Sequence, residues 1–328
     1  MWNFIDDRDS VSRNVPSGPV DKARTGEAPK AASAGGSRPA APGMSFTARD
    51  PVYKMENLIL PAHVLGQLNT LQNRFDKHAL IYDDWGLSEI DPCGKHIAFN
   101  LYGPPGTGKT MCVEALAARW GRKIIDVSYA EIESKYVGET GKNITAAFAA
   151  AKQQNAVLFF DEADSILGRR MSNVTQAADQ AVNVSRAVML KELDAFDGIV
   201  AFATNLSRNF DSAFVRRIPV HVEIPLPDED GRRKLVLKMV PDKVPFKAKI
   251  DVAKIAAATE SFSGGDLKNV LVNAISDIAS RNYAEISAEE VNAVFMDNVG
   301  RVRKAKQEVG TRVRVVSSED VDLNERQN

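Results

Sequence analysis

The stretch "IAFNLYGPPGTGKT", residues 97–110, decides the fold of this chain. Residues 97–102 form an apolar run typical of a buried strand, and residues 111–120 have helical character. Between them, GPPGTGKT fits the pattern G-x-x-x-x-G-K-[ST] at every position. Glycines let a loop wrap around a phosphate, and the N–H groups that open the next helix favour an anion. The stretch therefore predicts a phosphate-binding loop between a strand and a helix.

The rest of the chain divides into a part with strands and a part without them. Further short apolar runs lie at 123–128, 156–160 and 199–204, separated by segments with helical character such as 142–154. Strands that alternate with helices predict a parallel sheet covered on both faces. Helical patterns alone follow, at 231–240, 250–260, 264–282 and 287–299. We therefore predict an α/β P-loop NTPase fold with a small, all-helical lid domain.

Composition changes along the chain suggest four regions. Residues 1–50 are rich in Ala, Gly, Pro and Ser, and we expect a disordered tail because such a segment buries too little apolar surface to fold. We place the nucleotide-binding domain at 51–227, the helical lid at 228–300 and a charged C-terminal tail at 301–328.

Overall composition argues against several classes of partner. The chain has 42 Lys and Arg against 43 Asp and Glu, a net charge of -1, which favours neither nucleic acid nor an anionic membrane. No apolar run reaches the roughly 18 residues of a membrane span, and the N-terminus has no signal pattern. We interpret Cys93 and Cys112 as reduced thiols of a cytoplasmic protein, and we read no metal site from the four scattered histidines.

Candidate catalytic residues follow three of the strands. Lys109 is expected to reach the β- and γ-phosphates, and the Thr110 hydroxyl to bind Mg²⁺. In "AVLFFDEAD" (156–164), Asp161 suits the magnesium shell and Glu162 suits polarisation of the attacking water. Asn205, at the end of the strand 199–204, is placed to orient that water or to sense the γ-phosphate.

An adjacent arginine pair, Arg216 and Arg217, lies in "FDSAFVRRIPV". Phosphoryl transfer needs a cation beside the γ-phosphoryl group, and no arginine lies close to the phosphate loop in the sequence. A neighbouring subunit could supply Arg216 in trans; a solvated arginine pair is the alternative.

Taken together, these motifs resemble the AAA ATPases of the classical clade over about residues 55–300. "DEADSILGRR" (161–170) and "DSAFVRRIPVHVEIPLPDEDGR" (211–232) are most similar to the group that contains katanin and spastin. "SFSGGDLKNVLVNA" (261–274) resembles the start of the lid helix of the family, which would put Gly264 and Gly265 near the adenine and ribose. The predicted nucleotide contacts are therefore Gly103, Pro104, Pro105, Gly106, Thr107, Gly108, Lys109, Thr110, Met111, Gly264 and Gly265.

The resemblance also implies a mode of action. It implies a ring, usually a hexamer, with ATP and Mg²⁺ at subunit interfaces and with Arg216 and Arg217 acting on the nucleotide of the neighbour. The positions of an aromatic–hydrophobic–glycine loop that contacts polypeptide in the central pore fall on Lys135, Tyr136, Val137 and Gly138. We therefore expect an ATP-driven protein unfoldase or disassembly machine, with a substrate selected through the N-terminal tail or an adaptor.

Two other functions stay open at this point. A nucleic-acid motor or loader of the wider superfamily would use a basic surface, and "RVRKAK" (301–306) is the best support for it. A nucleotide-controlled assembly switch would bind ATP without turnover, which the intact pair of acidic residues at 161–162 argues against.

Overall fold

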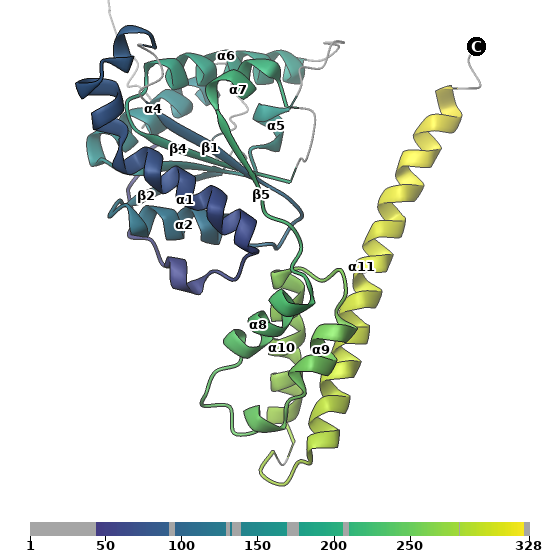
Figure 1. The fold of residues 1–328 in the computed structure, drawn as a ribbon. Helices are drawn as coiled ribbons and strands as arrows, with labels where there is room; N and C mark the ends of the chain where they lie inside the picture. The colour runs from purple at the N-terminus through teal and green to yellow at the C-terminus, as the bar shows by residue number, and fades with distance from the viewer. Residues whose placement is uncertain are drawn as a thin grey trace, which may run out of the picture. The chain divides into compact units, whose positions relative to one another are not determined.

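The structure is a computed structural model that describes residues 44–91, 96–128, 132, 139–168, 177–205, 210–281 and 283–324, with side chains described except at 177–181 and beyond 308. Five parallel strands form one sheet in the order β2-β3-β4-β1-β5 (Figure 1). The strands are β1 (Ile97–Tyr102), β2 (Ile124–Ser128), β3 (Val157–Asp161), β4 (Ile199–Thr204) and β5 (Val220–Glu223). The predicted α/β fold is confirmed, and β5 is a strand that the sequence patterns did not indicate.

Alternate residues of the strands enter two separate apolar clusters, one on each face of the sheet. In β3, Leu158 and Phe160 belong to one cluster, whereas Val157 and Phe159 belong to the other. Successive side chains of a strand point to opposite faces, so an uninterrupted apolar run is what a strand buried on both faces requires. The phosphate loop and the predicted acidic residues follow directly from strands held in this way.

Helices cover both faces of the sheet (Figure 1). One face packs against α1 (Ala62–Asp76) and α2 (Lys109–Arg119) through residues such as Leu68 and Leu116. The other packs against α4 (Glu139–Gln154), α5 (Asp164–Leu167), α6 (Ala177–Ala195) and α7 (Ser212–Arg217). Short helical turns precede β1 at η1 (Met55–Asn57), η2 (Leu80–Asp84) and η3 (Leu87–Glu89).

The C-terminal helices have an apolar cluster of their own, as the prediction of an all-helical lid requires. Val236, Leu271 and Phe295 are among its buried members. The elements are α8 (Glu229–Met239), η4 (Lys247–Lys249), α9 (Val252–Ala258), α10 (Gly264–Ala279) and α11 (Ala288–Asn324).

Helix α11 continues well beyond residue 300, although the sequence patterns predict a C-terminal tail from residue 301. Val302 packs against the lid cluster, Arg303 donates to the carbonyl of Ala258, and Lys306 forms an ion pair of 2.6 Å with Asp266. These contacts explain why the start of the predicted tail is part of the folded structure. The helical span includes "RVRKAK", whose Arg303 and Lys306 therefore have partners within the chain.

The last residues of the predicted N-terminal tail also belong to the packed structure. Arg49 forms an antiparallel bridge with Ile124 at the edge of the sheet, with N–H···O distances of 2.9 Å in both directions. Gln154 accepts from the Ala48 N–H at 2.8 Å and donates to the Phe46 carbonyl at 2.9 Å. Composition alone places residues 46–50 in the tail, because composition contains no information about these long-range hydrogen bonds.

Several groups that the sequence analysis interprets as inert can be located. Cys112 is buried, and burial raises the pKa of its thiol to about 12, whereas Cys93 lies outside the described residues. Within the described part of the chain, no cluster of His, Cys, Asp or Glu has the makings of a metal site by itself. No described helix combines the length and the apolar character that crossing a membrane requires.

Candidate functional site

The predicted phosphate loop joins β1 to α2 with a positive φ at each of its three glycines, and at two of them a side chain would also clash. Gly103 has φ +145°, and a Cβ there would lie 2.2 Å from the Ile224 carbonyl oxygen. Gly106 has φ +75°, and a Cβ there would lie 2.7 Å from the Ser263 hydroxyl. The first glycine allows the close approach of the chain that leaves the sheet, and the second allows the start of α10 to pack on the loop.

Lys109 occupies the first position of α2 and is 9% exposed. Its Nζ donates to the carbonyl oxygens of Gly103 at 2.9 Å and Pro104 at 3.0 Å, and to Asn205 Oδ1 at 2.9 Å. Burial lowers the pKa of this amine, and the negative charges of Asp161 and Asp164 act in the opposite direction. The ammonium group is therefore held at the mouth of the loop, where a bound phosphate could replace the carbonyl oxygens as its acceptor.

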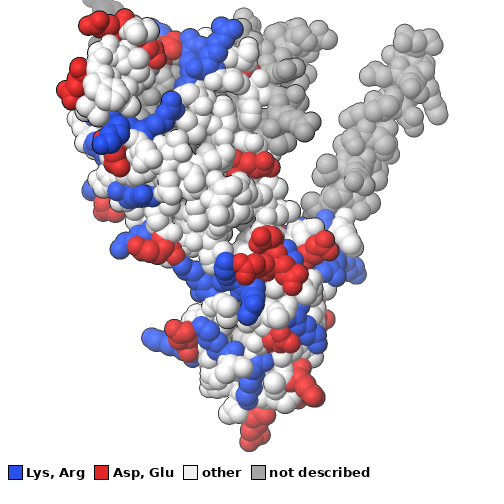
Figure 2. Space-filling model, viewed as in Figure 1, with Lys and Arg blue, Asp and Glu red and all other residues white. Residues whose placement is uncertain are grey.

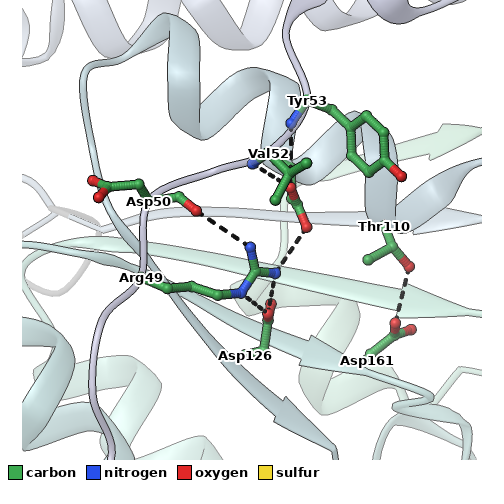
Figure 3. Close-up of polar contacts among 8 residues, drawn as sticks. Arg49, Asp50, Val52, Tyr53, Thr110, Asp126 and Asp161 are labelled. Carbon is green, nitrogen blue, oxygen red and sulfur yellow. Dashed lines mark hydrogen bonds and ion pairs between the residues drawn. The ribbon is translucent and has the colours of Figure 1, made fainter.

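The predicted magnesium ligands meet each other directly. The Thr110 hydroxyl donates to Asp161 Oδ2 at 2.9 Å, across the gap between α2 and the end of β3 (Figure 3). Mg²⁺ in nucleotide sites takes one or two protein oxygens, with phosphates and waters as its other ligands. A hydroxyl and a carboxylate brought to one point fit that donor set, even though a cage made only of protein ligands is absent from the described residues.

Glu162 adopts a backbone conformation that is rare for a residue with a side chain. Its φ is +52°, and its N–H donates to Asp161 Oδ1 at 2.9 Å. Positive φ in a residue other than glycine is uncommon and is concentrated at functional sites. The side chain is exposed and lines the same cavity as Thr110 and Asp161, as a carboxylate that polarises water must.

Asn205 links the lysine to a further acidic residue. Its Oδ1 accepts from Lys109, and its N–H donates to Asp164 Oδ1 at 2.8 Å. Asp164 was not among the predicted site residues, although it belongs to the same acidic run as Asp161. Its contribution is to fix the backbone at the end of β4, so that the amide of Asn205 faces the phosphate loop.

A cavity of about 750 Å³ extends from the phosphate loop toward the lid helices. That volume lies within the range of nucleotide-sized ligand sites. The Gly265 N–H donates to the Gly106 carbonyl at 2.9 Å, so the start of α10 contacts the loop directly. The predicted residues that line the cavity are Pro105, Gly106, Thr107, Gly108, Lys109, Thr110, Met111, Asp161, Glu162, Asn205, Gly264 and Gly265. Gly103 and Pro104 do not line it and contribute their carbonyl groups to Lys109 instead.

The remaining wall of the cavity comes from residues that the sequence analysis did not identify. Tyr53 and residues 57–62 line one side, and Leu235 and Met239 of α8 contribute apolar surface. Together with Met111, these side chains offer apolar surface against which a nucleotide base could pack, and Asp228, Asp230, Lys234 and Lys268 add charged groups to the same cavity.

The arginine pair lies away from this cavity. Arg216 and Arg217 end α7 and line a separate hollow with His96 and Asp194. Arg216 is exposed, whereas Arg217 forms a bidentate pair with Asp194, with N···O distances of 2.6 Å and 2.7 Å. Neither arginine lines the nucleotide cavity of its own chain, as the hypothesis of action in trans requires. The predicted pore-loop residues Lys135, Tyr136, Val137 and Gly138 lie outside the described residues.

Comparison with known proteins gives one family. Residues 99–226 match the family described as "ATPase family associated with various cellular activities (AAA)". The chain is 34% identical to the proteasome-activating nucleotidase of Methanothermobacter thermautotrophicus over 216 residues, which are 63% of this chain and 51% of that protein. It is 32% identical to spastin of Anopheles gambiae over 216 residues, 62% of this chain and 25% of that protein. It is 36% identical to the 26S proteasome subunit RPT4 of Saccharomyces cerevisiae over 181 residues, 53% of this chain and 41% of that protein.

The chain thus spans about half or less of the length of these curated relatives. The matches to spastin agree with the resemblance to the katanin and spastin group, and the proteasome ATPases match at similar identity. Residues 99–226 therefore match the AAA ATPase family, and this chain is similar in sequence to the proteasome-activating nucleotidase and to spastin.

Proposed function

We propose that this chain is an ATP-hydrolysing protein-remodelling enzyme that works as a ring and threads polypeptide through a central pore. One observation carries the proposal: a lysine, a threonine, two acidic residues and an asparagine from three separate segments of the chain converge on one cavity. They are Lys109, Thr110, Asp161, Glu162 and Asn205.

Each of these side chains has a role in ATP hydrolysis that its position permits. Lys109 would exchange its carbonyl acceptors for oxygens of the β- and γ-phosphates. Thr110 and Asp161 would hold Mg²⁺, which neutralises charge on the phosphates when bound. Glu162 would polarise a water whose oxygen attacks the γ-phosphorus, so that the bond to the β-phosphate oxygen breaks and ADP leaves.

The arginine pair supports assembly into a ring. Arg216 and Arg217 lie outside the cavity of their own chain, so they reach a γ-phosphate only if another subunit docks against α7. A head-to-tail contact of this kind closes into a cycle when its rotation permits. We infer a hexamer, in which each nucleotide is shared between two subunits.

Protein is the substrate class that the family relatives favour. Two of the similar proteins carry the proteasome in their names. On the face shown in Figure 2, Lys and Arg side chains are interspersed with Asp and Glu, which suits protein better than a polyanion. We infer that Tyr136 and Val137 contact an extended polypeptide in the pore, that residues 1–50 or an adaptor select it, and that the enzyme acts in the cytoplasm.

The test is capture of the substrate by a protein that binds ATP without hydrolysing it. Tagged Glu162→Gln protein is expressed in its native cell, isolated with ATP, and its bound components are identified by mass spectrometry. We expect discrete proteins to be retained, because an enzyme arrested before hydrolysis does not release what it holds.

The matched control is Glu162→Gln combined with Tyr136→Ala, which keeps the nucleotide site and removes the aromatic contact. Tyr136→Phe in the same background should restore capture, since the ring rather than the hydroxyl makes the contact. Retention of the same proteins without the aromatic ring would refute threading, and retention of nucleic acid in their place would indicate a loader.

A further inference from the structure

Three charged side chains meet beside the nucleotide cavity, and none of them was predicted as a site residue. Arg49 donates through Nη2 to Glu114 Oε1 at 2.8 Å and through Nε to Asp126 Oδ2 at 2.7 Å, and Nη2 also contacts Asp126 (Figure 3). We call Arg49, Glu114 and Asp126 the Arg49 cluster. It joins the N-terminal segment, defined here as residues 46–57, to helix α2 and to strand β2.

Glu114 is the buried centre of this cluster. It is 4% exposed, and its second carboxylate oxygen accepts from the N–H groups of Val52 at 2.7 Å and Tyr53 at 3.3 Å. Burial by itself raises the pKa of this carboxyl, but the bonds from Arg49 and the two N–H groups lower it overall. A buried carboxylate is tolerated only when it is paired and hydrogen-bonded, so the cluster depends on all of these donors.

The cluster lies about one helical turn beyond the phosphate end of the site. Glu114 follows the predicted magnesium ligand Thr110 by four residues on α2, so the two side chains share one face of that helix. Glu114 accepts hydrogen bonds from the N–H groups of Val52 and Tyr53, so it holds the backbone of a residue that lines the cavity. Tyr53 and Asn57 line the cavity, and the Lys54 N–H donates to Asn57 Oδ1 at 2.8 Å, which continues the ordered turn.

We propose that Arg49 is a positioning residue for the nucleotide site, because it holds Glu114 and Asp126 together and thereby fixes residues 52–57 as the wall against which the base of the nucleotide packs. This inference rests on the proposed function, since it assigns a role at the same cavity. Arg49 contacts no part of the cavity itself; it acts through the backbone of the N-terminal segment.

The experiment measures dissociation constants for Mg-ADP by titration calorimetry with the full chain. We compare wild type with Arg49→Ala, Tyr53→Ala and the double variant. Arg49→Ala should weaken Mg-ADP about tenfold, equivalent to about 1.4 kcal/mol, because the wall is no longer ordered. Tyr53→Ala should weaken it by a similar factor. If Arg49 acts by placing Tyr53, the double variant should bind no more than about twofold more weakly than Arg49→Ala.

A second ligand separates positioning from simple electrostatics. Mg-tripolyphosphate carries the phosphate charge but no base, and its affinity should be the same in wild type and Arg49→Ala. If Arg49 only attracted anions, Arg49→Ala would instead weaken the binding of both ligands by the same factor. Lys123→Ala is the matched control, because Lys123 lies beside the same segment, 3.9 Å from Asp50, and should leave both affinities unchanged.

Each outcome decides the proposal. Additive losses in the double variant, equal losses of both ligands, or unchanged Mg-ADP binding by folded Arg49→Ala would overturn it. Should Arg49→Ala fail to fold, Arg49→Lys replaces it, because lysine keeps the charge but lacks the planar fork that contacts two carboxylates. Wild type that binds no Mg-ADP would refute the proposed function, whereas wild-type binding with no effect of Arg49 refutes only this inference.

Discussion

The two adjacent arginines at the end of α7 should behave differently when each is replaced by alanine. Arg217 is held by Asp194 through two charged hydrogen bonds, and its Nη1 donates to the Ala213 carbonyl at 3.1 Å. Arg216 is exposed on the same helix. The structure therefore predicts a stability role for Arg217 within the subunit and leaves Arg216 as the better candidate for the nucleotide of a neighbour.

The size of the stability effect follows from the exposure of the ion pair. The side chains of Arg217 and Asp194 are 30% and 38% exposed, so solvent screens their attraction. A bidentate pair of this kind should stabilise the fold by about 1 kcal/mol. Arg217→Ala should then lower the Tm by about 1 to 2 °C for a chain of this size. Arg216→Ala should change stability by less than about 0.5 kcal/mol, because nothing buried is lost.

For ATP hydrolysis the order should be reversed, and Arg216→Ala should cause the larger loss. Arginines that act on a γ-phosphate from a neighbouring subunit contribute a thousandfold or more to kcat. Arg216→Ala should therefore reduce ATP hydrolysis by about a thousandfold while ATP affinity stays the same. Asp194→Ala, which removes the partner of Arg217 but neither arginine, should lower the Tm as much as Arg217→Ala and retain hydrolysis.

Thermal melting without nucleotide and at low protein concentration measures the first effect, since ligand and assembly then add no stability. Phosphate release under saturating ATP measures the second. Mixing inactive Arg216→Ala with inactive Glu162→Gln should restore part of the activity, because some interfaces then combine an intact arginine with an intact glutamate. The reasoning is refuted if Arg216→Ala lowers the Tm as much as Arg217→Ala, or if losses from Arg217→Ala and Asp194→Ala add in the double variant. Absence of activity in the mixtures would exclude action in trans.

Three shorter predictions concern the phosphate loop and the lid. Lys109→Ala should abolish ATP binding measured by calorimetry, because the loop loses its cation; unchanged affinity would reject the assignment of the loop. Gly106→Ala should cost about 1 to 2 kcal/mol in urea unfolding from its left-handed backbone, whereas Gly300→Ala, which meets no atom within 4 Å, should stabilise helix α11. Burial alone would raise the pKa of Asp266, but hydrogen bonds from Lys306 and Ser263 lower it overall, so the stability that Asp266 contributes is fully present above about pH 4 and is lost as the pH falls below 3.8. The urea midpoints of wild type and Asp266→Asn should accordingly differ at about pH 7 and approach each other as the pH is lowered below 3.8, and a difference that does not shrink in acid would contradict this.

Elements with strong local patterns could be predicted from the sequence. The strands Ile97–Tyr102 and Ile199–Thr204 have the expected bounds, because a strand buried on both faces needs an uninterrupted apolar run. Val220–Glu223 could not be recognised in the same way. It is an edge strand whose sequence, VHVE, alternates apolar and polar residues over only one short stretch. Such a segment becomes a strand through its pairing with β1 rather than through its own composition.

The candidate site likewise has a part that a local sequence pattern predicts and a part that depends on distant residues. A phosphate loop needs glycines, a lysine and a threonine at fixed spacing, so a local motif is enough to predict where Lys109 and Thr110 lie relative to a bound phosphate. The partners of these residues are non-local: Asn205 reaches Lys109 across 96 positions, and Asp161 reaches Thr110 across 51. They were predicted because each follows a strand of one parallel sheet, whose carboxyl ends must meet at one edge.

No such rule covers the N-terminal segment. Arg49 meets Glu114 across 65 positions and Asp126 across 77, from a region whose composition favours disorder. No sequence pattern links a single arginine, in a segment rich in alanine and proline, to its partners. In the sequence, Glu114 cannot be distinguished from the other charged residues of its helix. What could have drawn attention to Glu114 is its place four residues after Thr110 on a helix buried along most of its length, where an unpaired carboxylate would be too costly to retain. A buried charge beside a recognised motif therefore predicts a counter-ion elsewhere in the chain, and only the folded arrangement of the chain identifies that counter-ion as Arg49.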